Sequence, residues 1–512
     1  MLARWLRPRD FLPAPTRHTK ARLRGATTAV ILVVMAGACA TGGVTPTPTA
    51  LATPTPWPTS SAWPTTWPSA GPTQLPADSA SPTPSPLLVA TPGSSSTAAP
   101  LAYQIAMGKA GLLAPAADNG VLAATEINDF GVDLLRRLDS TGNLCASPTS
   151  IALALAMVRP GARGATATEM DKVLHGFGST GQAAEIVALL QAMRDVTAYD
   201  DSDWSSADPS ATPDHTGKQP VDELDVSNAV FSQEGMSLEQ AYLDSLSSGF
   251  GAGVGLLDYK NAAETARLTI NQWASNLTKG RIPEILHQGD IDQYTRLALA
   301  NAIYLKAGWM TRFDPTTTRS LPFTRADGSK VSVPTMAIET EFRYAAGSGY
   351  RAVDLPFDTS ASMMIVVPDD MSSFVAGLTA TQLGRIDSRF GIYDVNLTLP
   401  RFSTDTRVNL AETLKAMGMP TAFDPLNADL SGITTDEQLF LGHVIHQANI
   451  VVNEDGVIAS AVSVVEGRGG AAPIQPPHVT FKVNKPFLYF VREESTGAIL
   501  FMGRIDDPSA VS

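Results

Sequence analysis

The stretch NEDGVIASAVSVVEGRGGAAPIQPP, residues 453–477, combines two kinds of sequence that seldom stand together. From Val457 to Val465 it consists of small and apolar residues without charge, which suit a β-strand. Glycine, alanine and proline follow with one arginine, Arg468, which is typical of flexible, cleavable chain. Residue types alone leave open whether the stretch is a strand or a loop.

Helical periodicity precedes this stretch in the chain. Ile127, Phe130, Leu134 and Leu138 recur at helical spacing and predict an amphipathic helix. The almost wholly apolar residues 147–158 predict a second, buried helix, with the serine at 147 as its cap.

A third helix and several strands are also predicted. Thr166 and Glu169 have capping-box spacing, so the third helix is expected to begin there. Residues 297–309 alternate larger apolar side chains with alanines, which indicates a strand covered on both faces. Further strands are expected at residues 361–368, 395–402, 485–491 and 498–505. The fold class is therefore mixed, α+β.

The N-terminal region has the features of an export signal and a tether. Arginines and a lysine precede the uncharged residues 25–39, a pattern typical of a secretory signal in residues 1–38. Cys39 follows small residues and resembles the lipid-modified cysteine of bacterial lipoproteins, with ordinary signal cleavage as the alternative. Residues 39–110 are rich in proline, threonine and serine and predict an extended tether. A folded domain is expected at residues 120–509, exported or held at the cell surface by the lipid.

Composition excludes several function classes. The net charge of -13, without a run of basic residues, argues against a nucleic-acid partner. Seven histidines lack ligand spacing, and two cysteines allow no disulfide framework, so neither a metal site nor a cofactor is predicted. No catalytic sequence motif is present, although residues distant in sequence can still form a triad.

Five blocks in order resemble the serpin family of protease inhibitors, from about Ile127 to Pro508. These are NLCASPTSIALALAMVRPGARGATATEMDKVLH (143–175), INQWASNLTKGRI (270–282), ANAIYLKAGWMTRFDPTTT (300–318), VIHQANIVVNEDG (444–456) and VNKPFLYFVREESTGAILFMGRIDDP (483–508). The resemblance implies helices packed around a large central sheet, two smaller sheets and an exposed reactive loop. It also implies a monomer that is not an enzyme.

The resemblance implies that the opening stretch is a loop that becomes a strand. A target serine protease, or a cysteine protease, would cut this bait and become trapped in a covalent complex while the loop inserts into the central sheet. The implied hinge comprises Glu454, Gly456, Val457, Ala459, Ser460, Ala461, Val462 and Ser463. Residues implied at the points of sheet opening are Ser147, Ser150, Asn301, Trp309 and His446.

Two features depart from the family pattern or leave alternatives open. Val457 stands where serine or threonine is usual, and insertion should tolerate its β-branched side chain. Family spacing places the reactive bond at Gly470-Ala471, whereas Arg468 is the alternative bait for a trypsin-like protease.

Two other functions remain possible on these residues: a non-inhibitory binding or carrier protein with this fold, and a surface enzyme with a cleaved linker.

Overall fold

The structure of the chain is a computed structural model that describes residues 103–138, 142–196, 223–278, 280, 282–457 and 475–510. Its helices are α1 (Val121–Leu135), α2 (Pro148–Val158), α3 (Gly164–Val173), α4 (Ala183–Asp195), α5 (Gln240–Phe250), α6 (Tyr259–Leu277), α7 (Met371–Gly377), α8 (Ala380–Asp387) and α9 (Ala411–Met417). None of the helices in this part of the chain is long and apolar enough to cross a membrane.

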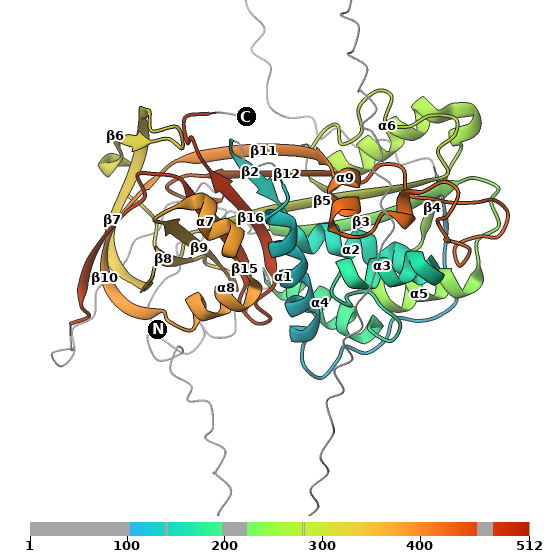
Figure 1. The fold of residues 1–512 in the computed structure, drawn as a ribbon, viewed down its shortest axis with the longest axis horizontal. Coiled ribbons are helices and arrows are strands. Elements are labelled where there is room, and N and C mark those ends of the chain that lie inside the picture. Colours follow the sequence, from blue (N-terminus) through green and yellow to red (C-terminus); the bar gives the residue numbers. More distant parts are fainter. Residues whose placement is uncertain are drawn as a thin grey trace, which may run out of the picture. The chain divides into compact units, whose positions relative to one another are not determined.

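A central sheet, with seven strands among the described residues, forms the middle of the fold (Figure 1). In order across the sheet, the strands are β1 (Gln104–Ala106), β4 (Val254–Leu257), β3 (Glu223–Gln233), β5 (Leu297–Gly308), β13 (Gly456–Val457), β12 (Ile445–Val452) and β11 (Phe402–Asn409). Because β13 runs antiparallel to both β5 and β12, these two strands run parallel to each other.

The remaining strands form a second sheet. Its order is β14 (His478–Lys482), β10 (Gly391–Pro400), β7 (Lys330–Gly347), β8 (Tyr350–Pro356), β9 (Ala361–Pro368), β15 (Phe487–Glu493), β16 (Ile499–Ile505) and β2 (Leu144–Ala146), and β6 (Arg319–Thr324) pairs with β7. The expected fold class is confirmed. The two smaller sheets are continuous because the long strand β7 pairs with β10 along one part and with β8 near its end.

The strand predicted at residues 297–309 is β5, and both of its faces are covered as its sequence indicates. Leu299 and Ile303 belong to the main core, which also contains α1 and α2. Ala298 and Ala300 pack in a second cluster with Trp273 of α6. In Figure 1, α6 accordingly lies on the opposite side of the β3–β5 pair from α2.

Helix α2 is buried along its whole length because α1 and strands of both sheets surround it. It contacts β3 and β5 of the central sheet and β16 of the second sheet. Its N-terminus forms as the sequence predicts, since the Ser147 hydroxyl accepts a hydrogen bond from the Ser150 amide at 3.1 Å. Pro148 occupies the first helical position, where its missing N–H leaves no bond unmade.

The predicted start of the third helix is wrong. α3 begins at Gly164, and no side chain caps it. Instead, the Thr166 hydroxyl accepts a hydrogen bond from the Asp429 amide at 2.9 Å, and the Glu169 carboxylate accepts from Thr421. Tertiary partners from a distant part of the chain therefore engage both side chains that had capping-box spacing.

The other predicted strands are confirmed, with one difference in bounds. Residues 361–368 form β9, and the stretches at 485–491 and 498–505 contain most of β15 and β16. Residues 395–402 span the end of β10 and the first residue of β11, because the chain leaves one sheet and enters the other at Arg401.

Candidate functional site

The turn at residues 453–456 carries the chain from β12 into β13. The Asn453 amide donates to the Gly456 carbonyl at 3.1 Å, and the Gly456 amide donates back to the Asn453 carbonyl at 3.3 Å. The Asn453 side chain also accepts a hydrogen bond from the Asp455 amide at 3.0 Å. The reversed chain enters the central sheet directly after this turn.

Gly456 lies where any side chain would collide with β5. Its φ is 143°, and a Cβ atom built on it would be 2.2 Å from the Ala307 carbonyl oxygen. Val457 follows, with 1% of its surface exposed, and pairs with Ala307 on one side and with Val452 on the other. Glycine at this position therefore lets a strand enter between β5 and β12.

β13 occupies only a small part of the interval between its neighbours. Among the described residues, backbone ladders connect β13 to β5 and to β12, and none connects β5 to β12 directly. Farther along, side chains bridge these two strands.

A buried network of hydrogen bonds provides that bridge. The Ser147 amide donates to Nε2 of His446 at 3.1 Å, and Nδ1 of His446 lies 3.1 Å from Oδ1 of Asn301. Nδ2 of Asn301 donates to the Ser150 carbonyl and to Oδ1 of Asn228 on β3. These five residues, hereafter the cross-sheet network, connect the N-terminus of α2 with β12, β5 and β3.

The hydrogen bonds of His446 define its protonation. Nε2 accepts from a backbone amide and so carries no proton, which leaves the ring proton on Nδ1 to be donated to Asn301. Burial lowers the pKa of His446 to about 3, because the charged imidazolium would lose its hydration. His446 is therefore neutral near pH 7 and acts as a hydrogen-bonding link.

A second group of residues, around Trp309, holds the turn in place. The Trp309 backbone amide donates to the Asp455 carbonyl, and its indole N–H donates to the Asn453 carbonyl, both at 2.9 Å. The indole is 2% exposed and stacks on Phe357, with ring centroids 4.7 Å apart. Trp309 thus fixes the end of β12 and the start of β13 against the second sheet.

Glu454 adds an ion pair to the same turn, between its buried carboxylate and the exposed side chain of Arg401. Its carboxylate lies 2.6 Å from a guanidinium nitrogen of Arg401 and accepts a hydrogen bond from the Thr318 hydroxyl. Burial acts to raise the pKa of Glu454, but hydrogen bonds from Arg401 and Thr318 outweigh it and hold the pKa below its ordinary value. Glu454 is therefore ionised at neutral pH, and its contacts with Arg401 and Thr318 help to hold the turn in place.

The structure brings the described site residues together in two groups. Ser147, Ser150, Asn301 and His446 meet in the cross-sheet network, where Ser150 contributes its backbone amide and carbonyl. Trp309, Glu454, Gly456 and Val457 meet at the turn. The other predicted positions lie outside the described residues: Cys39, Ala459, Ser460, Ala461, Val462, Ser463, Arg468, Gly470 and Ala471.

Several residues of these groups had not been predicted. They are Asn228, Thr318, Phe357, Arg401 and Asn453. No sequence pattern points to them, because each partner lies in a different strand or loop.

Comparisons with known proteins agree on one family. The family model for Serpin (serine protease inhibitor) matches residues 125–508. The leukocyte elastase inhibitor of Xenopus tropicalis is 32% identical over 395 residues, covering 74% of this chain and 97% of that protein. Neuroserpin of Homo sapiens is 29% identical over 401 residues, covering 75% of this chain and 92% of that protein.

Solved structures show the same fold. The crystal structure of a thermophilic serpin, tengpin, in the native state has a TM-score of 0.66 and 22% identity, and the match covers 79% of this chain and 100% of that one. Native protease nexin-1 with heparin has a TM-score of 0.62 and 28% identity, with 76% and 100% covered.

Proposed function

Because the chain belongs to the serpin family, we propose that it inhibits serine-type endopeptidases as a suicide substrate. Relatives named leukocyte elastase inhibitor and antithrombin-III support an inhibitory role. In this proposal the chain supplies no nucleophile: the catalytic serine belongs to the target protease. The partner is thus a protease, bound covalently.

The observation that carries the proposal is the position of β13. Val457 faces Ala307 of β5 and Val452 of β12, which defines a register for every residue that follows if the strand continues. Residues 458–464 would then extend along β12 as far as its first residue, Ile445. This segment lies within the uncharged run that ends at Val465, so insertion buries no charge between the two strands.

The same register brings a small polar residue to the cross-sheet network. Counting one residue at a time from the observed pairs, Ser463 would face Asn301 on β5 and His446 on β12. Insertion must break the hydrogen bond between Asn301 and His446, and a serine hydroxyl arriving between them can both donate and accept. The polar groups freed by opening the sheet would therefore be satisfied again.

Alternate residues of the inserted strand would face the main core. Ala459 would face Leu305 and Ile450, which are 3% and 1% exposed. Cross-strand neighbours point to the same face of a sheet, so the side chain at 459 must be small and apolar. Alanine at 459 and at 461 satisfies this requirement.

The trap follows from acyl-enzyme chemistry. The protease serine attacks the carbonyl of the reactive bond, the amine of the C-terminal fragment leaves, and an ester joins the protease to the N-terminal part of the loop. About ten residues would gain backbone pairs along β5, which at roughly 0.5 to 1.5 kcal/mol each supplies on the order of 10 kcal/mol. Insertion moves the ester relative to the protease active site. If the ester carbonyl leaves the oxyanion hole, loss of even one hydrogen-bond donor raises the barrier to deacylation by about 2.7 to 4 kcal/mol.

The test is to mix the protein with trypsin, chymotrypsin and elastase separately and to run each mixture on a denaturing gel. A protein–protease adduct that survives denaturation is expected with at least one of them. Sequencing the released C-terminal peptide then distinguishes cleavage at Gly470-Ala471 from cleavage after Arg468. Complete cleavage by every protease without an adduct would refute inhibition of these classes and favour a binding or carrier role.

We also propose that the chain is exported and anchored by lipid at Cys39, with residues 39–110 as a tether. The support is the basic, then apolar, sequence before Cys39 and the proline-rich composition after it. In a bacterial host, Cys39→Ala should release the exported protein from the membrane fraction. Equal membrane association of both forms would contradict the lipid anchor.

A further inference from the structure

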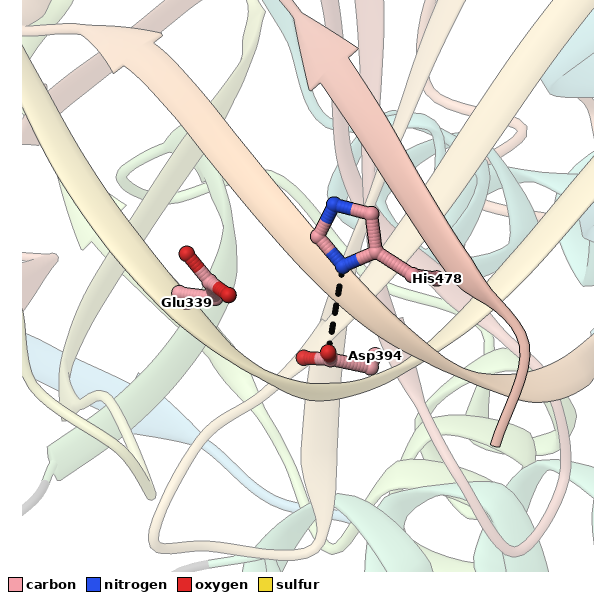
Figure 2. Close-up of side chains that lie close together, drawn as sticks. All are labelled: Glu339, Asp394 and His478. Carbon is pink, nitrogen blue, oxygen red and sulfur yellow. Dashed lines mark hydrogen bonds and ion pairs between the residues drawn. The ribbon is translucent and has the colours of Figure 1, made fainter. Parts of the chain in front are cut away.

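Three metal-ligating side chains meet on the second sheet, outside the site described above. Glu339 comes from β7, Asp394 from β10 and His478 from β14, and Figure 2 shows them on one face of these adjacent strands. Their convergence follows from register, because Asp394 pairs with His478 on one side and with Glu341 on the other. Glu339 lies two residues from Glu341 and so shares its face.

The ligand atoms are close enough for one ion. All three lie within 4.8 Å of one another, and Nδ1 of His478 is 3.1 Å from Oδ2 of Asp394. Ligands about 2 Å from a tetrahedral Zn²⁺ are about 3.3 Å apart, so the His478–Asp394 pair already has suitable spacing. Rotation about the side-chain bonds of Glu339 can bring its carboxylate to the same point.

The negative charge around these three side chains favours binding of a cation. Glu339 and Asp394 form no ion pair with a lysine or arginine in the described part of the chain, and Asp394 has only His478 as an ionic partner. Glu341 adds a third carboxylate on the same face. Like charges at such distances repel each other, and a divalent cation would convert this repulsion into attraction.

We propose that Glu339, Asp394 and His478 form a binding site for a divalent transition-metal ion, with Zn²⁺ as the best fit. One imidazole and two carboxylates suit Zn²⁺ better than Ca²⁺ or Mg²⁺, which prefer oxygen ligands alone. Three protein ligands leave a fourth position for water. The ring proton of His478 then sits on Nε2, and Nδ1 binds the ion.

A neighbouring amide orients one ligand. Nδ2 of Asn396 donates to Oε2 of Glu339 at 2.9 Å, which leaves Oε1 free to bind the ion. Such partners of metal ligands commonly change affinity by about 10- to 100-fold when removed. Asn396 is therefore a positioning residue of the proposed site.

The ion would fasten an edge strand. β14 pairs only with β10 within the described residues, and His478 is its first residue. A metal bound to Glu339 as well would connect β14 to β7, across the strand between them. Metal binding itself does not depend on the proposed inhibitory function, but under that function the ion would hold the chain just after the reactive loop.

The test is titration of the full chain with ZnCl₂ by calorimetry, comparing the wild type with His478→Gln and Asp394→Asn. Each substitution should lower the affinity of one Zn²⁺ site by at least about tenfold. His175→Gln is the matched control, because Nε2 of His175 also lies 3.1 Å from an aspartate, Asp133, but no third ligand lies within 4.8 Å of both in the described residues. It should leave the site unchanged.

Thermal unfolding gives a second readout. ZnCl₂ should raise the unfolding temperature of the wild type and of His175→Gln but not that of His478→Gln, since a ligand that binds only the folded state stabilises it. The proposal is overturned if the wild type binds no Zn²⁺, or if His478→Gln binds it as tightly as the wild type does. CaCl₂ binding as tight as Zn²⁺ binding would also overturn it, by indicating a merely acidic surface.

Discussion

The two ends of the segment between residues 457 and 475 lie in opposite environments. At the N-terminal end, Gly456 and Val457 are buried between two strands of the central sheet, and the buried carboxylate of Glu454 is paired with Arg401. At the C-terminal end, Gln475 and His478 are exposed, and β14 is an edge strand with one partner. The N-terminal end is therefore positioned to continue as a strand within the central sheet, whereas the C-terminal end forms the edge of the second sheet.

The largest expected effect follows from a charge on the path of insertion. Ala459→Arg should still allow cleavage of the loop but abolish the covalent complex with any protease that the wild type traps, because the guanidinium would face Leu305 and Ile450 in the core. Denaturing gels measure both products.

Glu466→Arg is the matched control, since the wild type already carries a charge there and the residue lies beyond the end of β12 in the extended register. This variant should still form the covalent complex with the protease. A stable complex formed by Ala459→Arg would disprove insertion along this path.

Substitution of Gly456 tests the close packing at the buried, N-terminal end of the segment. Gly456→Ala should lower the free energy of unfolding by about 3 kcal/mol, since its φ of 143° is strained for alanine and Cβ would meet the Ala307 carbonyl at 2.2 Å. Urea unfolding followed by circular dichroism measures the loss. Gly442→Ala, where a Cβ meets nothing within 4 Å, should change it by less than about 0.5 kcal/mol. Similar losses in both variants would contradict the close approach at Gly456.

His446 tests the network along the same path. With its pKa lowered from 6.5 to about 3, the unfolded chain binds a proton between these pH values and the folded chain does not. Stability therefore falls as pH falls from 7 to 5, by about 2 kcal/mol from this residue. His446→Gln, which can keep both hydrogen bonds, should lack this component in urea unfolding at the two pH values.

His443→Gln is the control, because His443 is exposed and bonded to Asn409. It should retain the pH dependence of the wild type. If His446→Gln retains it too, His446 is not the buried neutral group described here.

The smallest effect is expected at the exposed end. Without added metal, Asp394→Asn should change stability by less than about 0.5 kcal/mol, because the side chains of Asp394 and His478 are 38% and 53% exposed. Urea unfolding in the presence of a chelator measures this change. A loss as large as that of Gly456→Ala would remove the contrast between the two ends.

Much of the fold could be predicted from the sequence because periodicity reports burial directly. The almost wholly apolar α2 and the alternating β5 were predicted correctly, and both are covered on the faces that their residues indicate. The start of α3 was predicted wrongly, because the side chains of Thr166 and Glu169 form hydrogen bonds to distant segments of the chain. A local motif predicts local bonds only where tertiary partners do not compete for the same atoms.

By itself, the sequence determined that the fold mixes helices with buried strands, and its ordered blocks pointed to the serpin fold that the family match confirms. It also determined the uncharged run after Gly456. Only the tertiary structure decided what these residues meet: His446 and Asn301 are 145 residues apart, and Asp394 and His478 are 84 apart. The physical reason is that strand order and register place side chains opposite one another, and neither property is encoded in the spacing of residues along the chain.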